Sequence, residues 1–308
     1  MSSWNRPMFV FACACAVLAV VATAGLLIDD RVLGGAPIWA KPLKFAISGV
    51  VYGATWSWLC GLIDRRERVV RRVSAVIVGL LSLELVVIVG QVLRGRRSHF
   101  NLETPFDTVL YQIMAASIAV VWCGTLVLTV LVFRSDIQDR PLRLAVGLGA
   151  VISLVGIGVG ALMTIPTGDQ IAAANAGQGF HSMGAHTVGA PDGGPGLPLL
   201  GWSTTGGDLR IPHFVGMHAL QAVLLWHALL ARTRWPEPVR SRLVRIGAAG
   251  FTGLLALLTW QAYRGQPLTD PDGWTLLAFG ALVAGLVFAG NRATRQPADS
   301  PLLATVSR

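Results

Sequence analysis

Residues 106–133, FDTVLYQIMAASIAVVWCGTLVLTVLVF, decide the fold. Beyond Asp107 this stretch holds no charged residue, and a helix of this length would extend about 42 Å at 1.5 Å per residue. A helix needs about 20 apolar residues to cross the hydrocarbon core of a bilayer. The stretch therefore predicts a helix that spans a membrane.

Seven other apolar runs resemble this one, at residues 7–28, 39–63, 70–93, 142–165, 211–231, 243–263 and 274–289. The 308-residue chain is 53% hydrophobic and 13% charged, with a mean hydropathy of +0.60, whereas soluble domains are about 25% charged. This composition excludes an ordinary soluble globule and a disordered chain. We expect one transmembrane domain over residues 1–308, an all-α bundle of about eight spanning helices whose main partner is the lipid bilayer.

The net charge of +9 agrees with a membrane protein. In a soluble protein it would suggest nucleic acid, but cytoplasmic loops of membrane proteins are enriched in Lys and Arg, so we expect no nucleic-acid partner. If the N-terminus lies inside, 17 of the 25 basic residues, Arg65 and Arg308 among them, fall on the inner side and 8 on the outer side. The positive-inside rule then predicts a multi-pass protein of the cell inner membrane with both termini in the cytoplasm.

The first apolar run has a second interpretation. Arg6 precedes it, and Ala22 and Ala24 near its end resemble the small residues of a signal-peptide cleavage site. A cleaved signal peptide therefore stays open as an alternative to a first span.

One connection, residues 166–210, is far longer than the 4 to 6 residues that are usual in compact proteins. It is rich in glycine but also holds Phe180, Trp202 and several leucines. We expect an ordered extracytoplasmic cap between the fifth and sixth spanning helices.

The fifth run predicts close helix packing. Its small residues recur at intervals of three or four and share one helical face: Gly149, Ser153, Gly156 and Gly160. Small residues let two helix backbones approach closely in lipid.

Polar residues form stripes on four of the runs. Glu84 lies about 15 Å below the outer end of the third run, with Gln91 on the same face. Ionisable groups in spans are costly and usually functional, so we expect Glu84 to pair with a basic or amide group, most plausibly Lys44. The other stripes are Lys41, Lys44, Ser48, Tyr52 and Thr55 on the second run, Asp107, Tyr111 and Met114 on the fourth, and His213, His218 and Gln221 on the sixth.

All of these stripes start at the outer side, where Lys and Arg are normally depleted. Six basic residues oppose that trend: Lys41, Lys44, Arg94, Arg96, Arg97 and Arg210. Five of the six histidines lie in or near the same layer, namely His99, His181, His186, His213 and His218. An anionic small molecule or lipid ligand would explain this convergence, and so would structural ion pairs, lipid phosphates and hydrogen bonds to the cap.

The leading functional hypothesis is a haem or transition-metal site that serves membrane redox chemistry, because neutral histidine is the commonest metal ligand and haem is held by axial His or Met. The candidate metal ligands are His181, His186, His213 and His218. The candidate cofactor-binding residues are Lys41, Lys44, Gln91, Arg94, Tyr111, Arg210, His213 and Gln221. The candidate catalytic residues are Glu84, Asp107 and His218.

Two alternatives stay open. A membrane enzyme could bind an anionic lipid-borne or periplasmic substrate through Arg and Lys, with a histidine and Glu84, Asp107 or Asp208 as acid and base, although no G-x-S-x-G or H-E-x-x-H motif is present. A transporter would also use a carboxylate within the membrane, but the polar residues gather toward one face.

Overall fold

The structure is a computed structural model that describes residues 4–63 and 66–295. Arg65 and Arg308, which contribute to the predicted inner charge, lie outside these residues. In chain order the helices are α1 (Arg6–Ile28), α2 (Ala40–Cys60), α3 (Glu67–Arg94), α4 (Pro105–Phe133), α5 (Arg140–Val159), the 3-10 helix η1 (Gly160–Thr164), α6 (Gly168–Asn175), α7 (Arg210–Met217), α8 (Ala219–Ala231), α9 (Glu237–Tyr263) and α10 (Gly273–Arg295). Two short antiparallel pairs accompany them, β1 (Val32–Leu33) with β2 (Ala36–Pro37) and β3 (Thr187–Val188) with β4 (Gly207–Asp208).

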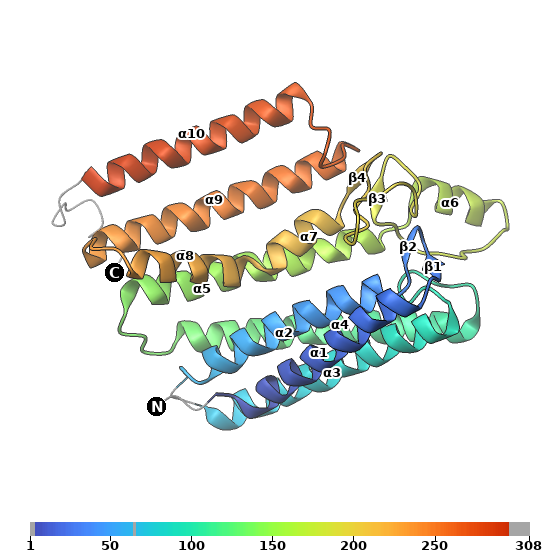
Figure 1. Ribbon diagram of the computed structural model, residues 1–308, viewed down its shortest axis with the longest axis horizontal. Coiled ribbons are helices and arrows are strands. Elements are labelled where there is room, and N and C mark those ends of the chain that lie inside the picture. Colours follow the sequence, from blue (N-terminus) through green and yellow to red (C-terminus); the bar gives the residue numbers. More distant parts are fainter. Residues whose placement is uncertain (1–3, 64–65, 296–308) are drawn as a thin grey trace.

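The long helices lie side by side, and the four strands and α6 gather at one end of the bundle (Figure 1). We call this the cap end. Helix α1 begins and α10 ends at the opposite end, which we call the inner end. The segment between η1 and α7 is folded over the bundle and includes α6, β3 and β4.

Six helices are long and apolar enough to cross a membrane: α1, α3, α4, α5 with its extension to Asn175, α9 and α10. The pair α7 and α8 makes a seventh candidate if the two count as one span. These helices support the prediction of an all-α membrane bundle. The predicted count of about eight would also need α2, which has 21 residues but is not among the candidates, since its polar stripe lowers its hydropathy.

The sixth apolar run, predicted as one helix, is instead broken between Met217 and His218 with a bend of 47°. Two contacts from α5 explain the break. The Ser153 hydroxyl donates a hydrogen bond to the Met217 carbonyl, and Gly156 lies against the backbone of Gly216 so closely that any side chain would collide. A side chain that takes a backbone carbonyl out of the helical ladder is a common cause of a kink.

The small-residue face of α5 packs closely on α7 and α8, as predicted. A Cβ on Gly149 would lie 2.9 Å from the Cα of Leu220, and one on Gly160 would lie 2.8 Å from Cε1 of His213. The missing side chains thus allow α5 to contact α7 and α8 along most of its length.

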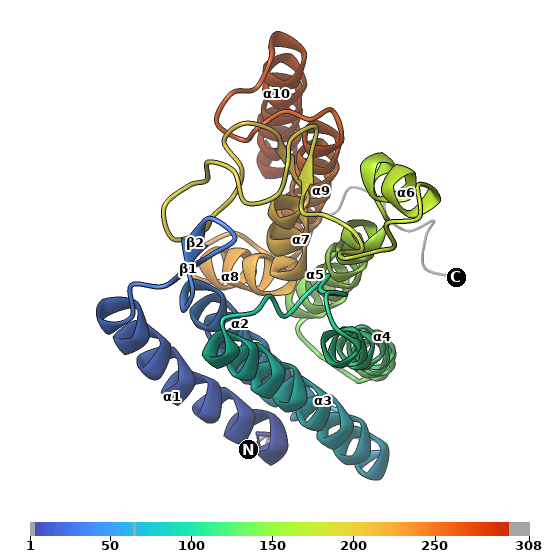
Figure 2. The same ribbon diagram turned by 90° about the vertical axis from the view of Figure 1, so that its right-hand side faces the viewer.

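Viewed from the cap end, α1 to α4 lie on one side and α9 and α10 on the other, with α5, α7 and α8 between them (Figure 2). One apolar core joins α1 to α5 and includes Trp56, Ile77 and Leu128. A second joins α5, α8 and α9 and includes Val223 and Val244. Helix α2 faces α8 across the boundary between the two groups, and polar side chains meet there.

Candidate functional site

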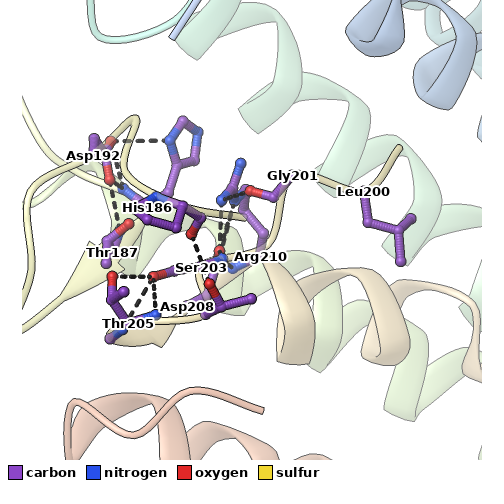
Figure 3. Close-up of polar contacts among 12 residues, drawn as sticks. His186, Thr187, Asp192, Leu200, Gly201, Ser203, Thr205, Asp208 and Arg210 are labelled. Atoms are coloured by element: carbon purple, nitrogen blue, oxygen red, sulfur yellow. Dashed lines mark hydrogen bonds and ion pairs between the residues drawn. The ribbon is translucent and has the colours of Figure 1, made fainter. Parts of the chain in front are cut away.

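The cap is attached to the bundle by an ion pair between the buried Asp208 and the half-buried Arg210 (Figure 3). The Asp208 carboxylate is fully buried and accepts hydrogen bonds from Nη2 of Arg210 at 2.5 Å and from the backbone amide of Ser203 at 2.8 Å. Arg210 also donates to the Gly201 carbonyl at 2.5 Å. Arg210, a predicted ligand-binding residue, therefore already has a structural role in holding the cap on α7.

A second cap contact places His186 in the predicted layer. Its Nδ1 lies 3.0 Å from Oδ2 of Asp192, and its ring packs on Phe100 with centroids 4.9 Å apart. Burial opposes ionisation of Asp192, but hydrogen bonds from the His186 ring and from the amides of His186 and Thr187 outweigh it and lower its pKa. Burial lowers the pKa of His186, with the contact to Asp192 acting in the opposite direction.

The two lysines of α2 lie beneath the cap without an ion-pair partner among the described residues. The Lys41 ammonium is 3.0 Å from Nδ1 of His99, in the connection between α3 and α4. Lys44 donates to the carbonyl of Leu200 in the cap at 2.7 Å. Burial and the neighbouring Lys41 lower the pKa of His99 well below its usual value, so the neutral ring accepts from Lys41. We call Lys41, Lys44, His99 and Arg210 the basic layer.

The predicted ion pair between Glu84 and Lys44 is wrong. Lys44 reaches up to the cap instead, and Oε1 of Glu84 is buried with no hydrogen-bond partner in the described structure. Glu84 itself is 4% exposed. The basic group that interacts electrostatically with it is Lys41, which in turn feels the charges of Lys44 and Arg210. Glu84 thus lies below the basic layer as an unpaired acceptor.

Three predicted site residues form a closed cluster at the cap end of α3 and α4. The buried carboxylate of Asp107 accepts from Arg94 at 2.7 Å, from Gln91 at 2.8 Å and from the Thr104 hydroxyl at 2.7 Å. We call Gln91, Arg94, Thr104 and Asp107 the α3–α4 knot. Because the buried Asp107 carboxylate has three partners, the knot joins two helix ends, while the Arg94 side chain stays 41% exposed.

Tyr111, another predicted site residue, lies one turn below the knot. It belongs to the apolar cluster beneath the cap, with its ring 5.9 Å from that of Phe100. The structure therefore places it as a packing residue.

Below the basic layer, polar contacts continue between the two helix groups. Oγ of Ser48 lies 3.2 Å from Nε2 of His218. One turn further from the cap, Gln221 donates to the Thr55 hydroxyl at 3.2 Å. Within the α1–α4 group, the Tyr52 hydroxyl of α2 is 2.8 Å from the Thr125 hydroxyl of α4. We call Ser48, Tyr52, Thr55, Thr125, His218 and Gln221 the polar seam.

The seam reaches the middle of the bundle. Ser48 lies eight residues into α2, and His218 lies eight residues beyond the start of α7, about 12 Å from the cap end at 1.5 Å per residue. Glu84 is at a similar depth in α3. These polar groups begin at the cap end, the face toward which the sequence gathers them, and continue to Thr55 and Gln221 further down the bundle.

The four predicted metal ligands do not form a common site. His186 contacts Asp192, Nδ1 of His213 contacts the Gly156 carbonyl and His218 contacts Ser48, while His181 is exposed. No group of three or more His, Cys, Asp or Glu side chains that could hold a metal ion exists in residues 4–63 and 66–295. The structure therefore gives no support to the haem or metal hypothesis.

Comparison with models of known protein families, with curated proteins and with solved structures finds no significant match.

Three features of the site were not predicted from the sequence. His99 was placed in the outer layer but not recognised as the partner of Lys41, Thr125 was not identified as a seam residue, and the break before His218 was not expected. The signal for the break was the facing pair Gly156 and Gly216, which a single sequence does not reveal as a contact.

Proposed function

We propose that the chain crosses the cell inner membrane eight times, with α2 and the bent α7–α8 pair as spans, the cap outside and both termini in the cytoplasm. The excess of Lys and Arg predicted for the inner side supports this orientation. The test is cysteine labelling in a background without Cys13, Cys15, Cys60 and Cys123. Gln178→Cys in the cap should react from outside, and Arg234→Cys between α8 and α9 should react from inside. Labelling of Gln178→Cys from the cytoplasm alone would reverse the topology.

We propose that this single-domain membrane protein transports a small anionic solute, which binds the basic layer and passes along the polar seam. The observation that carries the proposal is that the Lys41 and Lys44 ammonium groups, one turn apart, contact only neutral acceptors. Buried charges normally have ionic partners. A carboxylate or phosphate group could replace the Leu200 carbonyl at Lys44 and form a charge-assisted hydrogen bond, which is stronger than a neutral one.

The position of the seam supports transport. Polar side chains between two groups of helices provide hydrogen-bonding groups across a span. Transporter sites are commonly built where a spanning helix is interrupted near the midplane, and α7 and α8 are interrupted at His218. The unpaired Glu84 is a carboxylate whose charge state would respond to an anion bound at Lys41.

Flux into proteoliposomes tests this proposal. With labelled phosphate and labelled succinate as probes, Lys41→Gln and Lys44→Gln should each lower the initial rate of the transported probe at least about tenfold, because a hydrogen bond to a charged group contributes about 1.5 to 3 kcal/mol. Arg96→Gln is the matched control, since it removes an outer positive charge that pairs with Glu103 at 2.6 Å outside the layer. Equal rates in all variants, or no flux of either probe into wild-type vesicles, would contradict the proposal.

One observation favours an enzyme as the second candidate. Ser48 and His218 are within hydrogen-bond distance of each other, as a nucleophile and its base would be. The purified protein would then hydrolyse an activated phosphate or carboxylate ester, and Ser48→Ala would abolish the turnover.

An absorption spectrum with a Soret band, or a stoichiometric transition metal, would restore the redox hypothesis.

A further inference from the structure

At the inner end, three helices bring together a second set of polar groups that the proposed transport does not use. Helix α5 packs against α8 and α9, and these two pack against each other. Consequently the start of α5, the last turns of α8 and the first turns of α9 meet. We call the residues there the inner cluster: Asp139, Arg140, His227, Arg240, Ser241 and Arg245.

Several buried atoms of the inner cluster have no hydrogen-bond partner in the described structure. They are Nδ1 of His227, Nε of Arg240 and Oγ of Ser241. His227 is 8% exposed and Ser241 is 2% exposed. Buried polar groups are almost always hydrogen-bonded. Three unsatisfied groups on two adjoining helices therefore indicate a missing partner.

The charge of the cluster indicates an anionic partner. Arg140, Arg240 and Arg245 form no ion pair with any described residue. The nearby carboxylate, Asp139, lies 3.7 Å from Nε2 of His227. Arg240 is close enough to interact electrostatically with His227, and Arg140 is close enough to repel Arg245. The positive groups thus outnumber the carboxylate that faces them.

The ends of two helices add to the positive potential at the inner cluster. Helices α5 and α9 both begin at the inner end, and neither has a side-chain cap on its first amides. The positive end of a helix dipole favours an anion, although the second residue of each helix is a proline, Pro141 or Pro238, without an amide hydrogen. Asp139, in the capping position of α5, is turned to His227 instead.

We propose that the inner cluster binds a phosphoryl group. Arg240 and the Ser241 hydroxyl donate to its oxygens, His227 donates when its ring is protonated, and Arg140 and Arg245 supply charge. The group could belong to an anionic lipid headgroup at this membrane surface or to free phosphate, since both present the same oxygens. Basic sites between helices at the cytoplasmic side are typical of anionic headgroup binding.

The test uses the full-length protein with Lys41→Gln and Lys44→Gln in place, so that the basic layer does not contribute. Thermal unfolding is followed during titration with inorganic phosphate, with short-chain phosphatidylglycerol and with short-chain phosphatidylcholine. At least one of the first two should raise the Tm, because a ligand that binds only the folded state stabilises it. Stabilisation by phosphate identifies a free anion site, and stabilisation by phosphatidylglycerol alone identifies a lipid site.

Two variants connect the effect to the cluster. Arg240→Gln and Ser241→Ala should each raise the dissociation constant of the stabilising ligand, for Arg240→Gln about tenfold or more. Arg234→Gln, an exposed arginine in the connection between α8 and α9, should leave it unchanged. Ser241→Ala removes only an unpartnered hydroxyl, so this variant should fold as the parent does. No stabilisation by phosphate or phosphatidylglycerol, or equal affinity in all variants, would overturn the proposal, whatever the outcome of the flux experiments.

Discussion

The α3–α4 knot and the basic layer lie at the same end of the bundle, yet they differ in how their charged side chains are satisfied. In the knot, the Asp107 carboxylate has ionic, amide and hydroxyl partners. In the basic layer, Lys41 and Lys44 contact a neutral imidazole and a carbonyl, while Glu84 below them lacks a partner for one oxygen. The knot therefore holds two helices together, whereas the layer and Glu84 have capacity for a ligand.

The largest expected effect is on the free energy of unfolding, which should fall more when the knot is broken than when the layer is. Asp107→Ala should lower the free energy of unfolding by about 3 kcal/mol, because it leaves the buried Gln91 amide and the Arg94 guanidinium without their common acceptor. Reversible unfolding in mixed detergent would measure this change. Lys44→Ala is the comparison and should cost only about 1 kcal/mol, because it breaks one hydrogen bond to a carbonyl but also removes a partly buried charge that has no ionic partner among the described residues. Equal costs would remove the distinction between the two regions.

The next effect is a dependence of stability on pH that the layer and cap should show and the knot should not. The pKa of His99 is lowered by burial and by Lys41, with His186 and His213 acting in the same direction. Since the folded pKa lies below the unfolded value of about 6.5, the unfolded state binds more protons and stability falls as the pH drops below about 6.5. One such histidine contributes a slope of at most about 1.4 kcal/mol per pH unit. His186 shifts in the same direction.

Thermal unfolding of wild type and His99→Gln between pH 7 and pH 5 would measure the slope. The glutamine oxygen can still accept from Lys41, so the variant should keep the fold and lose its share of the pH dependence. The knot has no histidine and should add nothing in this interval. An unchanged slope in His99→Gln would show that His99 does not remain neutral in the folded protein.

Sequence patterns predicted those features of the fold that depend on residues close in the chain. The apolar runs and the length of the 166–210 connection predicted the long helices and the cap, and the spacing of Gly149, Ser153, Gly156 and Gly160 predicted the packing face of α5. The same spacing could not show that this face would press on Gly216 and break the next helix. That contact joins residues 60 positions apart, and only the packed bundle determines it.

The candidate site was predicted as a region but not as a set of contacts. Helical periodicity correctly placed Lys41, Ser48 and Thr55 on one face of α2, because it depends only on the rise and turn of a helix. Which groups meet across that face depends on the heights and rotations of the neighbouring helices. For this reason the sequence predicted an ion pair between Glu84 and Lys44, whereas in the structure Lys44 donates to the Leu200 carbonyl. The carboxylate that does have partners at the cap end is Asp107, in the knot.

The smallest expected effect on stability is that of a substitution at Glu84. It gives the sharpest test of the difference between the knot and the layer. Glu84→Gln replaces a buried carboxylate that has an unpartnered oxygen with a neutral amide of the same shape. The free energy of unfolding should therefore change by less than about 1 kcal/mol, or rise, because burying a neutral group costs less than burying a charged one. Asp107→Asn is the matched control, since the same chemical change in the knot weakens the ion pair to Arg94 and should cost about 2 kcal/mol. The effects on transport should be reversed, with the larger loss in the Glu84 variant. Glu84→Gln should lose transport of the probe that wild type carries, whereas the Asp107→Asn protein that remains folded should transport at the wild-type rate. If Glu84→Gln is as unstable as Asp107→Asn and its folded fraction still transports, then Glu84 is a structural residue like Asp107, and the unpaired oxygen carries no functional meaning.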